Sequence, residues 1–176
     1  MTVLVAGVGY HHLSDLSFGP LLVERLREMN WPEEVHIEDF SYGPIALLHW
    51  FEESPGKRFD RAIFAGAMER GREPGSLSTY SWPLSPPDPD EVQERVAEAL
   101  TGVISLENLL IIAQYFEVLP PETQVVELEP VELEWGMELS PLCRKRREQA
   151  AERIHREVHS GARPSDNGRN KEVRNR

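Results

Sequence analysis

Short apolar runs and longer helical patterns alternate along the chain. Apolar runs predict strands at about 2–7, 35–40, 59–67 and 124–128, and a looser alternation at 76–82 predicts an antiparallel edge strand. Helical spacing predicts helices at about 18–29, 44–51, 91–100, 106–113 and 141–158. Strands that alternate with helices are typical of layered folds. We therefore predict an α/β domain, a three-layer α/β/α structure with a mainly parallel, roughly five-stranded sheet.

The first strand runs into a glycine turn and a polar loop. Val3-Leu4-Val5 reads as a buried parallel strand, and Gly7 and Gly9 follow it. The loop then carries His11, His12 and Asp15 before the first helix. Because open α/β sheets bind ligands at the carboxyl ends of their strands, this loop is a candidate binding site.

The composition changes near the C-terminus. We expect a folded domain over 1–158 and a disordered basic tail over 159–176, since the tail has almost no apolar residues. The tail could touch an acidic partner, but a solvated spacer is the favoured interpretation.

Length, charge and cysteine content exclude several classes of protein. The 176 residues suit a single domain, and the net charge of −11 disfavours a nucleic-acid binder. No apolar stretch approaches the roughly 20 residues that span a bilayer, so no membrane contact is expected. The single cysteine, Cys143, excludes an internal disulfide and a multi-cysteine zinc site. We expect a cytoplasmic protein.

Common catalytic templates do not match the sequence. His12 stands where a dinucleotide-binding fingerprint needs its third glycine, and neither a phosphate-binding loop nor a nucleophile elbow is present. Ser14 beside His12 and Asp15 is too local a cluster for a catalytic triad, whose members normally converge from separate segments.

Five polar side chains are candidates for recognising a substrate or a metal ion. His11, His12, Asp15 and Asp39 lie near predicted strand ends, and Glu69 follows the third strand. Two histidines with one or two carboxylates suit a divalent cation. Alternatively, the histidines are polar loop residues, and Asp15 caps the first helix. Asp39, or its neighbour Glu38, is expected to orient the same loop.

Two tryptophans stand in loops that could contact a partner. Trp82 opens a proline-rich segment, and Trp135 precedes Gly136 and the last helix. Loops with aromatic residues often bind partners. Packing of both side chains against the sheet edge is the simpler interpretation.

The order of four motifs resembles the hydrogenase maturation proteases. They comprise Gly7-Val8-Gly9 through Asp15 to Gly19, the second strand with its Ser41-Tyr42-Gly43 turn, the third strand with Pro74-Gly75-Ser76, and the closing strand with Trp135-Gly136. The resemblance spans about residues 1–158. It implies a protein that acts on the precursor of a nickel–iron hydrogenase large subunit, whose C-terminal extension the family removes after nickel insertion.

The resemblance also implies three ligands for the nickel of the precursor. The matching positions here are Leu16, Gly66 and Gly102, and Tyr10 replaces the asparagine of the glycine turn. Leucine and glycine side chains offer no donor atom to a metal ion.

Three functions follow as hypotheses. The chain is an endopeptidase with an unorthodox ligand set drawn from His11, His12, Asp15 and Asp39, or a catalytically silent assembly or checkpoint factor that binds the large subunit. The third hypothesis is an unrelated α/β binding domain. The resemblance implies no cofactor of the chain itself, and the one metal that it implies is the nickel of the precursor.

Overall fold

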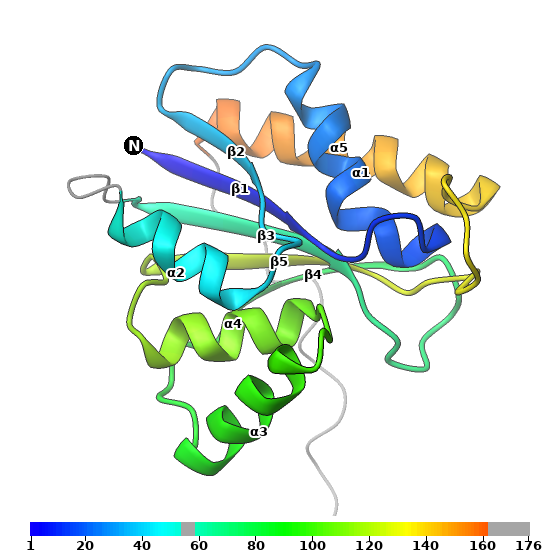
Figure 1. Cartoon of the computed structure of the whole chain (residues 1–176). Helices are drawn as coiled ribbons and strands as arrows, with labels where there is room; N and C mark the ends of the chain where they lie inside the picture. Colours follow the sequence, from blue (N-terminus) through cyan, green and yellow to red (C-terminus); the bar gives the residue numbers. More distant parts are fainter. Residues whose placement is uncertain (54–58, 162–176) are drawn as a thin grey trace, which may run out of the picture.

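Five strands form one sheet in the order β2-β1-β3-β5-β4 in the computed structural model, which describes residues 1–53 and 59–161 (Figure 1). The strands are β1 (Val3–Val8), β2 (Val35–Asp39), β3 (Arg61–Ala67), β4 (Leu77–Ser81) and β5 (Glu122–Leu128). All neighbouring pairs are parallel except β4 with β5, which is antiparallel. The predicted three-layer fold with an antiparallel edge strand is confirmed.

Helices cover both faces of the sheet. They are α1 (Phe18–Arg27), α2 (Pro44–Glu52), α3 (Pro89–Leu100), α4 (Leu106–Tyr115) and α5 (Pro141–Ser160), and a short 3₁₀ helix, η1 (Ser14–Ser17), leads into α1. Figure 1 shows α1 and α5 on one face and α2, α3 and α4 on the other. No described helix is long and apolar enough to cross a membrane.

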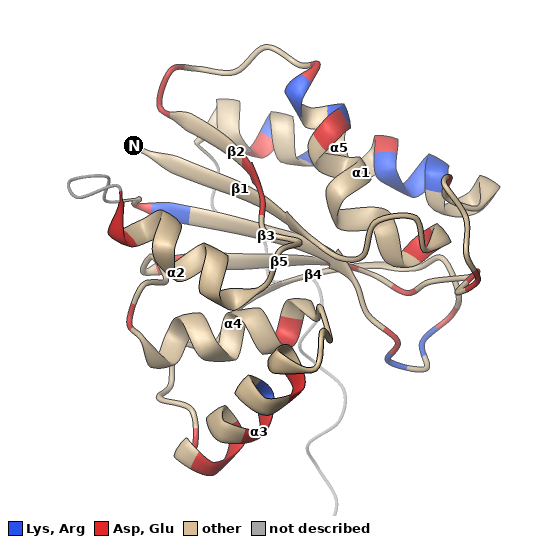
Figure 2. Cartoon of the chain, viewed as in Figure 1, with Lys and Arg blue, Asp and Glu red and all other residues tan. Residues whose placement is uncertain are grey.

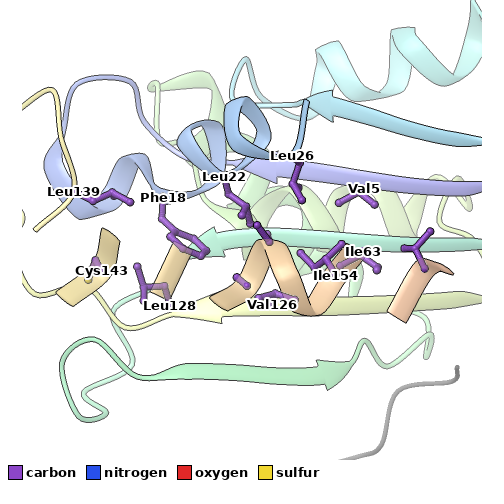
Figure 3. Packing of buried hydrophobic residues seen from close by; sticks show 14 of the residues in the cluster. Val5, Phe18, Leu22, Leu26, Ile63, Val126, Leu128, Leu139, Cys143 and Ile154 are labelled. Atoms are coloured by element: carbon purple, nitrogen blue, oxygen red, sulfur yellow. The ribbon is translucent and has the colours of Figure 1, made fainter. Parts of the chain in front are cut away.

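Each face of the sheet buries its own hydrophobic cluster. Val5, Ile63 and Val126 pack against α1 and α5, where Phe18 and Ile154 meet them (Figure 3). The intervening strand residues point to the other face and pack against α2 and α4; they include Leu4, Phe64 and Val125. Because both of their faces are buried, the central strands β1 and β3 read as nearly continuous apolar runs.

The first glycine turn lets β1 and α1 approach closely. A Cβ atom at Gly7 would lie 2.3 Å from the carbonyl oxygen of Gly19, so neither position tolerates a side chain without a shift of backbone. This contact fixes where the loop between them, residues 9–13, leaves the sheet.

The observed helix caps and helix ends agree only in part with those expected from the sequence. Of the two aspartates that the sequence offers as a cap, Asp88 and Asp90, it is Asp88 that caps α3, by accepting a hydrogen bond from the Asp90 N–H. Ser140 stands at the N-cap of α5, but its hydroxyl makes no capping bond and binds Asp15 instead. The last helix runs to Ser160, two residues beyond the predicted domain end, and the remainder of the predicted tail, 162–176, lies outside the described residues.

Candidate functional site

The carboxyl ends of β1, β2 and β3 lie side by side at one edge of the sheet. Gly7 of β1 is level with Asp39 of β2, and Val8 is level with Gly66 of β3. The strands β2 and β3 lie on opposite sides of β1 in the sheet, so this edge is a topological switch point. The predicted candidate loop therefore lies where open α/β sheets bind ligands.

His11 and Asp39 meet at this edge. The Nε2 atom of His11 lies 3.6 Å from a carboxylate oxygen of Asp39. The other oxygen of Asp39 accepts hydrogen bonds from the N–H and the hydroxyl of Ser41. Glu38 instead faces Arg27 at 4.0 Å. Asp39, rather than Glu38, is thus the residue that faces the histidine loop.

Four exposed rings form a continuous line beside this pair, which we call the aromatic ridge: Tyr42, His11, His12 and Trp135. Successive ring centroids along the ridge are 5.9, 6.2 and 6.3 Å apart. Tyr42 is 76% exposed and Trp135 79% exposed. Trp135 therefore does not pack against the sheet, whereas Trp82 is half-buried and donates its indole N–H to Gln114 at 2.7 Å.

The histidine loop is held in an unusual backbone conformation. His12 and Ser14 both have positive φ angles, 63° and 44°. The Gly136 N–H donates to the His12 carbonyl at 3.1 Å, and the Ser14 N–H donates to the Gly136 carbonyl at 3.0 Å. Backbone strain of this kind persists only where the surroundings fix it, and it is common at functional sites. The bonds to Gly136 hold the two halves of the ridge together.

Asp15 is fully buried and serves as an anchor. Its carboxylate accepts hydrogen bonds from the N–H groups of Val131, Glu132 and Ser140 and from the Ser140 hydroxyl, all between 2.8 and 3.0 Å. Asp15 therefore does not cap α1, as one hypothesis held. It also does not join the two histidines in a ligand set. It fastens the start of η1 to the segment that carries Trp135.

Burial and hydrogen bonding shift two pKa values behind the ridge. Burial by itself would raise the pKa of Asp15, but the bonds from Glu132, Ser140 and Val131 outweigh it and hold the pKa below the ordinary value. Burial raises the pKa of the nearby Cys143 thiol to about 11. Cys143 is therefore protonated near neutral pH and does not supply a thiolate nucleophile.

The three positions that match the ligands of the resembled family hold no donor side chain. A Cβ atom at Gly66 would lie 2.7 Å from the Val8 carbonyl oxygen and 3.2 Å from the Leu106 side chain. Leu16 lies in η1, and its carbonyl accepts from the Tyr10 N–H. Gly102 has a φ of 89°, in the exposed turn after α3. A side chain at Gly66 would therefore need the backbone to shift, whereas the positive φ of Gly102 favours glycine in an otherwise open position.

Tyr10 bridges the histidine loop to the segment before α4. Its hydroxyl accepts a hydrogen bond from the Ile104 N–H at 3.1 Å. Tyr10 replaces the asparagine of the family's turn, and its ring spans the gap between the first loop and the segment that contains Gly102.

No three His, Cys, Asp or Glu side chains in residues 1–53 and 59–161 come together in a way that could hold a metal ion. Glu69 is exposed in the segment after β3, and Asp15 is engaged in its own hydrogen bonds. Of the expected grouping of two histidines with one or two carboxylates, the described residues bring together His11 and Asp39.

A buried carboxylate network at the end of β5 was not predicted from the sequence. Glu127 is 2% exposed and accepts hydrogen bonds from the Tyr80 hydroxyl at 2.8 Å and from Arg70 at 3.3 Å. Arg72 also pairs with Glu127, and Glu129 accepts from the backbone N–H groups of Arg70 and Gly71. The available signal was a glutamate near the end of an apolar strand and a second one directly after it. The network orders the loop after β3.

The sequence matches no family model, and no curated protein matches it. Solved structures, in contrast, are similar over most of the chain. One is a hydrogenase 2 maturation peptidase from a Thaumarchaeota archaeon, at 25% identity and a TM-score of 0.63, covering 90% of this chain and 99% of that one.

Two further structures agree with it. The hydrogenase maturating endopeptidase HybD from E. coli matches at 23% identity and a TM-score of 0.68, covering 92% of this chain and 94% of that one. The [NiFe] hydrogenase maturation protease HycI from Thermococcus kodakarensis matches at 20% identity and a TM-score of 0.67, covering 90% and 92%. These likenesses confirm the predicted resemblance: the chain has the fold of the hydrogenase maturation proteases.

Proposed function

We propose that this chain is a member of the hydrogenase maturation protease family that binds the precursor of a nickel–iron hydrogenase large subunit as an assembly or checkpoint factor. The proposal rests on the shared fold, on the ordered motifs and on the chemistry left at the carboxyl edge of the sheet.

The observation that carries the proposal is the packing around Gly66. A Cβ atom there would press on the Val8 carbonyl and the Leu106 side chain, so the aspartate that the family places at this position would fit only if the backbone shifted. Leu16 and Gly102 likewise offer no donor atoms. The nickel of a precursor would therefore meet no three-ligand site at these positions, and we derive no cleavage step through it.

The aromatic ridge supplies the recognition surface in this proposal. Exposed tyrosine and tryptophan side chains at a partly rigid edge are typical anchors for a partner segment. The backbone bonds to Gly136 and the buried Asp15 anchor hold the ridge in place before a partner arrives, which lowers the entropy cost of binding. The large subunit, or its C-terminal segment, is the expected partner.

Endopeptidase activity is the second candidate, and the His11–Asp39 pair favours it. A carboxylate 3.6 Å from an imidazole can orient the ring for proton transfer. Removal of a C-terminal extension would then depend on His11, with His12 beside it.

Calorimetric titration with purified large-subunit precursor tests the proposal. We expect saturable binding by the wild-type chain and at least about tenfold weaker binding by a His11→Ala/His12→Ala variant. A His49→Ala variant is the matched control, because His49 is an exposed histidine of α2 away from the ridge. Absence of binding to the precursor would overturn the proposal. A precursor shortened by the wild type and left intact by the double variant would establish the second candidate.

A further inference from the structure

A second pair of histidines lies far from the carboxyl edge, on the last turns of α5. His155 and His159 are four residues apart, so both side chains project from the same face of the helix. Their ring centroids are 4.0 Å apart. The ring of Trp31, from the segment after α1, lies 4.9 Å from His155 and 5.8 Å from His159.

Hydrogen bonds fix which nitrogen of each ring carries the proton. The Nε2 atom of His155 lies 3.0 Å from the Asn30 carbonyl oxygen, and the Nδ1 atom of His159 lies 2.8 Å from the His155 carbonyl oxygen. A carbonyl oxygen can only accept, so each of these nitrogens is the donor. In the neutral rings, Nδ1 of His155 and Nε2 of His159 therefore keep their lone pairs.

This arrangement is the one that metal-binding histidines normally have. Such a residue donates its second ring N–H to a carbonyl or carboxylate, which sets the tautomer and the orientation of the ring. Two histidines spaced by four residues on one helix face are a known zinc-binding pattern. Ligand nitrogens about 2.0–2.1 Å from a tetrahedral zinc ion lie about 3.3 Å apart. The two rings are tilted by only 35°, so the exposed His159 side chain has to turn to direct its Nε2 atom at an ion bound by Nδ1 of His155.

The surroundings suit a cation that keeps some of its water. The two rings line a shallow surface depression together with Met29, Glu152, Arg156 and Ser160. Glu152 supplies a negative charge and Arg156 a positive one, while the whole chain carries a net charge of −11. Figure 2 shows charges of both signs along α5. Imidazole ligands favour zinc, copper and nickel over magnesium or calcium.

We propose that His155 and His159 form a two-imidazole site for a divalent transition metal ion at the C-terminal end of α5. Water or a partner completes the coordination, because the described residues offer no third protein ligand here. The site is independent of the carboxyl edge and of the function proposed above.

Fluorescence titration of the tag-free full chain with Ni²⁺ tests this site. Bound Ni²⁺ quenches an indole at short range, and Trp31 touches both rings. A Trp135→Phe background removes the tryptophan that reports on His12. In that background we expect saturable quenching with one ion per chain, which a further Trp31→Phe substitution abolishes.

A His159→Gln variant removes one ligand with little risk to the fold, because His159 is exposed and its hydrogen bond stays within α5. We expect the apparent affinity for Ni²⁺ to fall at least about tenfold. His49→Gln, on α2, is the matched control and should titrate as the parent does. Calorimetry with Zn²⁺ should likewise show weaker binding by His159→Gln than by the parent and by His49→Gln.

Two results would overturn the proposal. One is a His159→Gln protein that binds Ni²⁺ and Zn²⁺ as tightly as its parent. The other is quenching that persists unchanged after Trp31→Phe, since the ion would then lie elsewhere.

Discussion

The Asp15 carboxylate accepts two hydrogen bonds from Ser140, one from its N–H and one from its hydroxyl, both at 2.8 Å. The two residues are 125 positions apart in the sequence. Their contact joins the first loop of the domain to the start of its last helix, and it fixes the segment that presents Trp135 beside His12.

An Asp15→Asn substitution should destabilise the protein by about 2–4 kcal/mol, because an amide places a donor against N–H groups that need an acceptor. Urea unfolding at neutral pH measures the change. A loss below about 0.5 kcal/mol would show that the carboxylate does not anchor the loop.

Acidification should weaken the wild type through the same group. The folded-state pKa of Asp15 lies below its ordinary value of 3.8, so its contribution is complete above that pH and is lost as the pH falls through the folded pKa. The unfolding free energy of the wild type should therefore decline more steeply below about pH 4 than that of Asp15→Asn. Parallel curves for the two proteins would contradict the assigned shift.

Much of the fold could be predicted from the sequence because its signals are local. Buried parallel strands such as β1 and β3 read as apolar runs, and the alternation of strands and helices restricts the layers. The observed strand ends differ from the predicted ones by one or two residues, since pairing with a neighbouring strand rather than composition decides where a strand ends. Asp88 was found as a cap because the cap and its helix are adjacent.

The candidate site was predicted less well because its contacts are long-range. The sequence placed His11 and Asp39 at neighbouring strand ends, and they do meet. It could not show that the Asp15 carboxylate would accept hydrogen bonds from Ser140. Nor could it show that Trp135 would be exposed while Trp82 is half-buried. Glu127 was missed because its partners, Arg70 and Tyr80, lie in other segments.

A Gly66→Asp substitution should restore the side-chain type of the family without restoring its site. The new Cβ atom would meet the Val8 carbonyl, and the carboxylate would be buried beside Leu106, so we expect a loss of about 3 kcal/mol or more. Gly102→Asp is the control: that position is open, and aspartate tolerates a positive φ, so its cost should be about 1 kcal/mol or less. Thermal unfolding compares the two, and equal losses would remove the steric argument.

Trp135→Ala should weaken binding of the large-subunit precursor at least about tenfold while leaving the melting temperature nearly unchanged, because the ring is 79% exposed. Trp82→Ala should do the reverse, lowering the melting temperature through lost packing and the lost bond to Gln114. Calorimetry and thermal unfolding on both variants separate the two roles. Unaltered affinity in Trp135→Ala would exclude the aromatic ridge as the recognition surface.

Glu127→Gln should destabilise the protein by about 1–3 kcal/mol, since it weakens the hydrogen bonds of a buried carboxylate to Arg70 and Arg72, which are partly exposed and keep Glu107 and Glu129 as partners. Tyr80→Phe removes one hydrogen bond from the same network and should cost about 1 kcal/mol. Denaturant unfolding measures both. A Glu127→Gln protein as stable as the wild type would mean that the network does not order the loop after β3.

The central claim is that the chain binds a large-subunit precursor without cutting it. The most direct test is an intact-mass measurement of nickel-loaded precursor after incubation with the purified chain, alongside size-exclusion chromatography of the mixture. We expect a stable complex in which the mass of the precursor is unchanged. A precursor shortened at one fixed position, and only when the chain is present, would contradict it.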